Sequence, residues 1–554
     1  MQLMQSNNSS LTKNDTNMKS KFRILLSSIT FIAGVALLFA ALVLPGQLAA
    51  QYNQGANPKH NHYKLIDIGT FGGPESFINN TGNIFPPLNM RGMAVGGSAT
   101  SVATSSTSDF FVCGGPEGLV PNVFHGFKLQ NGMVTDLGAL ESPTQNCSNA
   151  GSINTRGEIV GDSEIDSIDP LFGVKEVRAA LWKQGQIMDL GTLGGSASLA
   201  AAINDRGVVV GFALNAVPDP VSMFYFVIGG FTNGTQTRAF RWQNGVMQDL
   251  GTLGGPDALA DFANERGQIA GSSYTNSIIN PVTGIPTTHP FLWENGVMTD
   301  LGTLGGTLAF FAAADMVGGL NNRGQVVGES NLAGDLTFHP FLWTPPGPMQ
   351  DLGTLGGDTG SANALNDAGE IVGKADLPGS QIHDAVLWRN GVINDLGTQD
   401  SDPCSNALGI NERGQIVGGS SDCNTFLHAF LISNGGGMVD LNSLIPPNSA
   451  LTLTEATTIN ERGEIAGMGV PAGCSPQDAS TCGHAYVLIP CDENHPGIEG
   501  CDYSLVGASA GVNGASVAQR NHAGLSSTAI PIRRPFSHGN PHLQFGGRGW
   551  GFAP

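Results

Sequence analysis

Two residue types with the capacity for chemistry recur at regular intervals along the chain. A histidine precedes a short apolar segment at five places: His125, His289, His339, His428 and His484. An aspartate followed by an apolar residue and then, in most copies, a glycine recurs at eight places: Asp67, Asp136, Asp189, Asp249, Asp300, Asp351, Asp395 and Asp440. Histidines can bind zinc. Paired carboxylates roughly 5–10 Å apart can hydrolyse glycosides.

The arrangement of the strands that carry these residues argues against both a zinc site and a paired-carboxylate site. One histidine or aspartate of each set occurs per repeat, so equivalent side chains lie on equivalent strands of neighbouring sheets. Such strands are on the order of 10 Å apart if strands within a sheet are spaced by about 4.8 Å. Zinc ligands instead lie about 2 Å from the metal. We therefore interpret the histidines as structural and the aspartates as acceptors for the backbone of their own turns.

The repeat itself extends from residue 63 to residue 490. Its clearest segment, Asp-Leu-Gly-Thr-Leu-Gly-Gly, begins at Asp189, Asp249, Asp300 and Asp351. A second segment, Asn-x-Arg-Gly, begins at Asn89, Asn154, Asn204, Asn264, Asn321, Asn411 and Asn460, and Asn366 begins an eighth copy without the arginine. Short apolar runs between Asn and Gly turns predict strands joined by hairpins. Four strands in about 50 residues, repeated, are typical of a propeller blade.

The ends of the array predict how it closes. The last repeat ends near Pro490 without a fourth strand, whereas residues 63–67 form a fourth strand that no earlier repeat precedes. We expect these two ends to pair, because closure removes exposed strand edges. The predicted fold is therefore an all-β, closed eight-bladed β-propeller with four-stranded blades. The N-terminal strand completes the last blade, and the competing fold is an open β-solenoid.

These segments resemble the HAF-repeat family of probable extracellular repeat proteins. His428-Ala429-Phe430 matches the motif that names the family, and His484-Ala485-Tyr486 is close to it. The resemblance covers about residues 63–490 and implies export and repeated β structure. It implies no activity and no set of catalytic residues.

The connections between second and third strands vary most, and variable loops on a rigid scaffold are where binding usually occurs. One of them contains Phe224, Tyr225 and Phe226, which we predict as a binding patch. The alternative is that this apolar segment packs on its own blade. Another connection carries Asp162, Glu164, Asp166 and Asp169, where calcium could bind, although no EF-hand loop is present. We otherwise expect no cofactor and no resident metal.

The cysteines indicate the compartment of the protein, and its net charge argues against one class of partner. The eight cysteines fit an oxidising compartment. The expected pairs are Cys404 with Cys423, Cys474 with Cys482 and Cys491 with Cys501, which leaves Cys113 and Cys147. The formal net charge of −20 argues against nucleic acid as a partner, because phosphate binding needs a basic surface.

The chain divides by composition into four parts. Residues 1–50 read as a signal peptide or signal anchor, with Lys19, Lys21 and Arg23 before an apolar run from Ile24 to Leu44. Residues 51–62 form a linker, residues 63–490 the propeller, and residues 491–554 a low-complexity, flexible tail. We expect an extracellular or cell-surface protein, in contact with a membrane only through the N-terminal segment if that segment is not cleaved.

The predicted function is binding of an extracellular polysaccharide or exported protein by the long connections of one face, without catalysis. One alternative is a propeller enzyme, such as a glycosidase or lyase, with carboxylates gathered from several loops. A site of that kind would leave no local motif in the sequence. The other alternative is an architectural protein of the cell surface with no discrete ligand.

Overall fold

The computed structural model describes residues 62–78, 87–108, 113–115, 118–119, 121–223, 234–310, 318–433 and 435–501. These residues fold into repeated antiparallel β-sheets, an arrangement typical of β-propellers. The described helices are short: α4 (Ala479–Cys482), η2 (Leu441–Leu444) and η3 (Pro476–Asp478). Within this part of the chain no helix has the length and apolar character needed to cross a membrane. The predicted signal segment lies outside the described residues.

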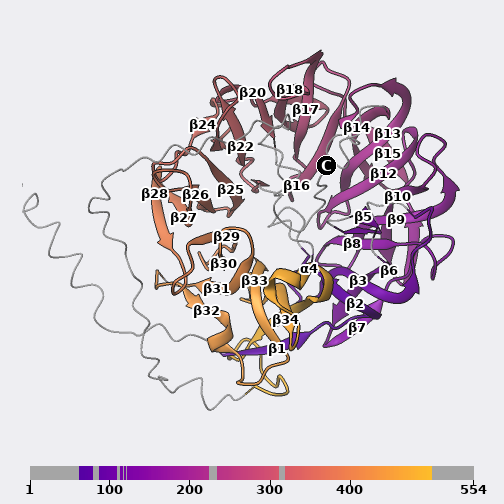
Figure 1. The fold of residues 1–554 in the computed structure, drawn as a ribbon. Coiled ribbons are helices and arrows are strands. Elements are labelled where there is room, and N and C mark those ends of the chain that lie inside the picture. Colours follow the sequence, from indigo (N-terminus) through magenta and orange to yellow (C-terminus); the bar gives the residue numbers. More distant parts are fainter. Residues whose placement is uncertain are drawn as a thin grey trace, which may run out of the picture. The chain divides into compact units, whose positions relative to one another are not determined.

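The first three repeats each contribute one four-stranded sheet (Figure 1). The first contains β2 (Gly72–Phe77), β3 (Ala94–Ala103), β6 (Asn122–Gln130) and β7 (Met133–Asp136). The second contains β8 (Ser148–Ile153), β9 (Ile159–Ile168), β10 (Lys175–Lys183) and β11 (Gln186–Asp189). The third contains β12 (Gly194–Ile203), β13 (Val209–Asp219), β14 (Gly234–Gln243) and β15 (Val246–Asp249). A separate pairing joins β4 (Gly114–Gly115) to β5 (Gly118–Leu119).

The fourth and fifth repeats share one sheet of nine strands, where two separate sheets were expected. The fourth repeat supplies β16 (Ala258–Ala263), β17 (Ile269–Ile279), β18 (Pro286–Glu294) and β19 (Val297–Asp300). The fifth supplies β20 (Gly305–Phe310), β21 (Gly319–Leu320), β22 (Val326–Leu332), β23 (Phe338–Trp343) and β24 (Gln350–Asp351). A single parallel pairing, Thr288 with Leu308, connects the two groups. Within each group the strand order matches that of the other repeats.

The last three repeats again form four-stranded sheets. The sixth contains β25 (Gly360–Leu365), β26 (Ile371–Asp376), β27 (His383–Arg389) and β28 (Val392–Gly397). The seventh contains β29 (Cys404–Ile410), β30 (Ile416–Ser421), β31 (Phe426–Ile432) and β32 (Val439–Asp440). The eighth contains β33 (Leu451–Ile459), β34 (Ile465–Pro471), β35 (His484–Pro490) and β1 (Tyr63–Asp67).

The eighth sheet joins the two ends of the repeat array. Strand β1 pairs antiparallel with β35, in a register that runs from Tyr63 opposite Pro490 to Asp67 opposite Tyr486. In Figure 1 the indigo β1 lies in the same sheet as the orange β33 and β34. The N-terminal strand therefore supplies the fourth strand that the last repeat lacks, as the sequence predicts.

Turn residues explain where the strands end. In the hairpin between the third and fourth strands, Asn131 and Gly132 have φ values of 52° and 75°, and Asn244 and Gly245 have 53° and 84°. Two successive residues with positive φ form the turn that matches the twist of antiparallel strands. In the turn after the first strand, Gly157 of Asn154-Thr155-Arg156-Gly157 has a φ of 80°, which favours glycine.

The turn asparagines also connect neighbouring sheets. The Nδ2 group of each donates to the backbone carbonyl of the asparagine that begins the next Asn-x-Arg-Gly turn or its variant. The chain of donors is Asn89 to Asn154, Asn154 to Asn204, Asn204 to Asn264, Asn264 to Asn321, Asn321 to Asn366, Asn366 to Asn411, Asn411 to Asn460, and Asn460 to Asn89. The last bond, at 2.9 Å, returns to the first repeat. We call these eight residues the asparagine circuit.

The hydrophobic core lies between adjacent sheets. Five tryptophans at equivalent positions of the repeats, Trp182, Trp242, Trp293, Trp343 and Trp388, are all buried there. Trp182 donates to Leu137 O and Trp388 to Leu352 O, each in the preceding repeat. Ala200 and Ala260, on the first strands of their repeats, are buried in the same apolar clusters, and a β-bulge follows each of them.

Candidate functional site

The repeated histidines and aspartates form hydrogen-bonded pairs. Nδ1 of the histidine lies 2.8–3.0 Å from the aspartate on the next strand in four repeats: His125 with Asp136, His289 with Asp300, His339 with Asp351, and His484 with Asp67. Arg238 takes the place of the histidine opposite Asp249 at 2.9 Å. His428 instead contacts Asp402. The aspartate of each of the four histidine pairs also accepts a backbone N–H of its own turn, as Asp300 does from Gly302 at 2.8 Å.

These pairs predict a dependence of stability on acid pH. Burial of Asp300 opposes its ionisation, but hydrogen bonds from His289 and Gly302 N–H outweigh burial and hold the pKa of Asp300 below its usual value of 3.8. The same partners act on Asp136 through His125 and Gly138. A carboxyl with a lowered pKa stabilises the folded state above its ordinary pKa, and this contribution is lost as the pH falls through the folded pKa.

We therefore expect Asp136→Asn with Asp300→Asn to lower the melting temperature at neutral pH and to flatten its decline below pH 3.8. The matched control is Asp395→Asn, since that repeat carries Asp384 in place of the histidine. Thermal unfolding followed by circular dichroism across this range measures both effects. An unchanged acid slope in the double variant would show that the pairs do not contribute.

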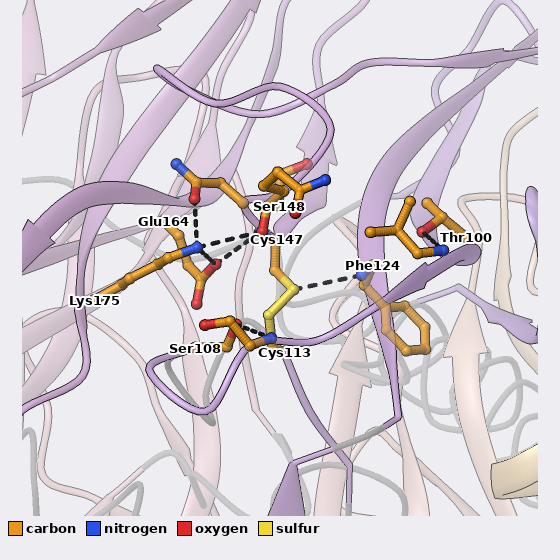
Figure 2. Close-up of a disulfide and its surroundings, with 12 residues drawn as sticks. Thr100, Ser108, Cys113, Phe124, Cys147, Ser148, Glu164 and Lys175 are labelled. Carbon is orange, nitrogen blue, oxygen red and sulfur yellow. Dashed lines mark hydrogen bonds and ion pairs between the residues drawn. A yellow bond between two sulfur atoms is a disulfide. The ribbon is translucent and has the colours of Figure 1, made fainter.

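Disulfides fasten the connections between second and third strands. Cys113 and Cys147 are fully buried and bonded, which ties the long connection of the first repeat to the residue that precedes β8 in the second (Figure 2). Glu164 Oε2 accepts the backbone N–H of Cys147 at 2.9 Å, and Lys175 Nζ lies 3.5 Å from that carboxylate oxygen. Cys404–Cys423 similarly joins β29 to the connection after β30. Cys474–Cys482 and Cys491–Cys501 complete four pairs, which coincide with the expected ones and are typical of an oxidising compartment.

Residues 491–501 contact the last sheet. The N–H of Cys491 donates to His62 O at 2.8 Å. His495 is buried, with Nδ1 2.7 Å from Asp492 and Nε2 3.5 Å from Glu464. Glu464 in turn accepts from Asn460 of the asparagine circuit. These contacts attach the first residues of the predicted tail to the last sheet.

The four acidic residues proposed for calcium have separate partners. Burial raises the pKa of Asp162 to about 7. Glu164 faces Cys147 and Lys175, Asp166 accepts from Ser142 and Asn146, and Asp169 accepts from Ser196. Among the described residues, the group that satisfies the geometry of a metal site is Cys113, Cys147 and Glu164, and its two sulfur atoms are bonded to each other. The structure therefore does not gather the four acidic residues around one point.

The same connections carry exposed aliphatic side chains. We call this set of residues the loop-face patch: Ile168 and Leu171 in the second repeat, Val217 in the third, Ile278, Ile279 and Val282 in the fourth, and Leu336 in the fifth. Ile278 and Leu336 are 75% and 70% exposed. Phe224, Tyr225 and Phe226 belong to the third-repeat connection, but they lie outside the described residues. The loop-face patch could not be recognised from an aromatic cluster in the sequence, because its members are aliphatic and are divided among four connections.

One catalytic pattern was also missed. Gly507-Ala508-Ser509-Ala510-Gly511 fits the Gly-x-Ser-x-Gly pattern of serine hydrolases. That pattern has meaning only at a turn between a strand and a helix, and these residues lie outside the described chain. In a segment rich in Gly, Ser and Ala it carries no assignment.

No protein-family model and no curated protein sequence matches the chain. Among solved structures, a puromycin-hydrolysing peptidase of Mycobacterium tuberculosis is similar at 12% identity with a TM-score of 0.35, over 61% of this chain and 51% of that one. Dipeptidyl peptidase 4 of Porphyromonas gingivalis has the same identity and TM-score, over 64% of this chain and 62% of that one. TolB of Acinetobacter baumannii is similar at 9% identity with a TM-score of 0.28, over 68% and 95%. The chain thus spans about half the length of the first peptidase, and these similarities are too distant to assign an activity.

Proposed function

We propose that this chain is an exported, closed eight-bladed β-propeller of the HAF-repeat kind. The asparagine circuit supports closure, because eight successive donors return to the first residue. The pairing of β1 with β35 supports it independently. The four disulfides support export, since such bonds persist in oxidising compartments.

The function we propose is non-catalytic binding of an extracellular ligand by the face that carries the second-to-third-strand connections. The observation that carries this proposal is the loop-face patch, because the second-to-third-strand connections of four consecutive repeats each carry exposed aliphatic side chains. Exposed apolar side chains mark an interaction site where they form a contiguous surface. Aliphatic side chains suit a protein partner better than a polysaccharide, which stacks on aromatic rings.

A matched pair of variants tests the proposal. The first replaces Ile278, Ile279 and Leu336 with serine. The second replaces Met133, Val246 and Val297, which are equally exposed but lie at the hairpins between third and fourth strands. The purified chain is applied to panels of immobilised exported proteins and polysaccharides, and both retention and released product are measured. We expect the first variant to weaken retention roughly tenfold or more and the second to leave it unchanged, because hot-spot residues each contribute more than 1 kcal/mol.

The panel also separates the alternatives. Release of a shortened glycan would favour the propeller enzyme. Asp219 and Asp257, whose side chains interact, are both buried, so that enzyme would need other residues. Retention that survives the first variant would place binding elsewhere. Neither retention nor product would favour the architectural role.

A further inference from the structure

A cavity lies among the first strands of the third to sixth repeats, next to the turns of the asparagine circuit. Its volume is about 220 Å³. Its apolar wall includes one large side chain from each of these repeats: Ile203, Phe262, Leu320 and Leu365. Ile203 and Phe262 are buried, and Leu320 and Leu365 are half-buried. Because four successive repeats build this wall, the cavity exists only where their first strands come together.

The solvent-exposed side of the cavity is polar. It carries Glu265 and Asn322, which occupy equivalent positions in successive turns. Glu265 Oε1 accepts the N–H of Asp205 at 2.9 Å, and the N–H of Glu265 donates to Asn322 Oδ1 at 3.0 Å. Within the described part of the chain, Glu265 Oε2 receives no hydrogen bond, and Glu265 is the only charged residue that lines the cavity. One carboxylate oxygen is therefore left for a ligand.

The charges around Glu265 favour a cation at this oxygen. Burial raises the pKa of Glu265, and the charge of Asp205 raises it further. The N–H of Asp205 and the guanidinium groups of Arg206 and Arg156 lower it, but their effect is the smaller one. No arginine is among the described residues that line the cavity, and Arg206 donates to Arg266 O at 3.5 Å. A cation inside the cavity would stabilise the charged form of Glu265.

The size and the lining of the cavity select the class of ligand. Pockets that hold drug-sized ligands measure about 300–1,000 Å³, so a volume of about 220 Å³ suits a smaller molecule and is too small for an oligosaccharide. The apolar wall favours a hydrocarbon or aromatic group, because contact with the wall removes that group from water. The carboxylate favours an ammonium group and disfavours a carboxylate or a phosphate.

We propose that this cavity binds a small organic ammonium compound. The apolar group of the compound lies against Phe262 and Leu365, and its ammonium group donates to Glu265 Oε2. The turns beside the cavity join first to second strands, so they lie at the opposite end of each sheet from the second-to-third-strand connections. The site is therefore separate from the loop-face patch and goes beyond the ligand proposed for it.

A ligand-observed NMR titration of the full chain with phenethylammonium chloride near neutral pH tests the site. We expect saturable binding, and binding of phenethyl alcohol that is weaker by roughly tenfold or more, because the alcohol has the same ring and no charge. Glu265→Gln keeps an acceptor for the N–H of Asp205 and removes the charge, so it should weaken binding of the ammonium probe by a similar factor.

Glu412→Gln is the matched control for the charge. Glu412 occupies the equivalent position in the seventh repeat and accepts the N–H of Asp367 at 2.6 Å, but it does not line the cavity. We expect this variant to bind the ammonium probe as the unchanged protein does. Ala263→Leu tests the cavity itself, because Ala263 lines it and a larger side chain occupies part of its volume. That variant should weaken binding roughly tenfold while Glu265 keeps its charge.

Several results would overturn the site. One is the absence of saturable binding by a chain that circular dichroism shows to be folded, and another is equal affinity for the ammonium and the alcohol. Unchanged binding in Glu265→Gln, or an equal loss in Glu412→Gln, would mean that the cavity carboxylate does not hold the ammonium group. If Glu265→Gln does not fold, Ala263→Leu decides, and unchanged binding by that variant would place the probe outside the cavity.

Discussion

Replacing Tyr63 with alanine is expected to lower the free energy of unfolding by about 4 kcal/mol, within the range for removal of a buried aromatic side chain. Tyr63 is 3% exposed, and it packs in a cluster with residues that follow it by more than 350 positions, such as Val417, Leu451 and Leu488. Its contribution therefore exists only if the N-terminal strand reaches the last two repeats. Chemical denaturation of the full chain, followed by tryptophan fluorescence, measures the loss.

The matched control for this prediction is Met133→Ala. Met133 is 71% exposed in the first repeat, and removal of an exposed side chain changes stability by about 0.5 kcal/mol or less. If Tyr63→Ala costs no more than this control, the N-terminal strand does not pack in the core of the last repeats.

Replacing Asn411 with alanine should also cost about 4 kcal/mol. The side chain is 2% exposed and makes four hydrogen bonds. Its Nδ2 donates to Gln415 Oε1 and Asn460 O, and its Oδ1 accepts from the N–H groups of Arg413 and Gln415. Each bond contributes about 1 kcal/mol, and the buried groups left without partners add to the cost.

Asn424→Ala is the control for the circuit, because Asn424 is an exposed turn residue of the same repeat. We expect that variant to unfold at the denaturant concentration of the unchanged protein. Equal losses in the two variants would mean that the asparagine circuit adds no stability beyond that of an ordinary turn.

The strands could be predicted from the sequence because particular residue types in the turns determine where each strand ends. Asparagine and glycine at fixed positions impose positive φ, so the ends of strands such as β6 and β14 follow from Asn131 and Asn244. The role of the strand at residues 63–67 could be predicted by counting the strands of each repeat, because the last repeat lacks a fourth strand. The link between the fourth and fifth repeats could not be predicted, because the single pairing of Thr288 with Leu308 depends on how two sheets meet.

The contacts between repeats were harder to predict than the strands. The asparagines were interpreted as turn residues only. A signal for their second role was present, since Glu or Gln often stands four residues later, as at Glu158, Gln268 and Gln415, and accepts from the same amide. The histidine and aspartate partners could have been inferred from their positions on adjacent strands.

The candidate sites depend on residues outside the repeat pattern. Asp219 and Asp257 lie on different repeats, and only the folded chain brings them together. The loop-face patch has the same origin, since its members are scattered over four connections of unequal length. The patch predicted at Phe224, Tyr225 and Phe226 remains a prediction.

A cross-link between the two ends of the repeat array tests closure most directly. Lys64 and Ile489 are opposite one another in the pairing of β1 with β35. All described cysteines are already in disulfides, so a variant with Lys64→Cys and Ile489→Cys introduces the only new thiols in the sequence. We predict an intramolecular disulfide between these positions in the folded monomer, identified by mass spectrometry of the digested chain. The control is a second variant with Lys64→Cys and Ile168→Cys, in which we predict no disulfide between the two new cysteines. Two free thiols, or only intermolecular dimers, in the first variant would contradict closure of the propeller by its N-terminal strand.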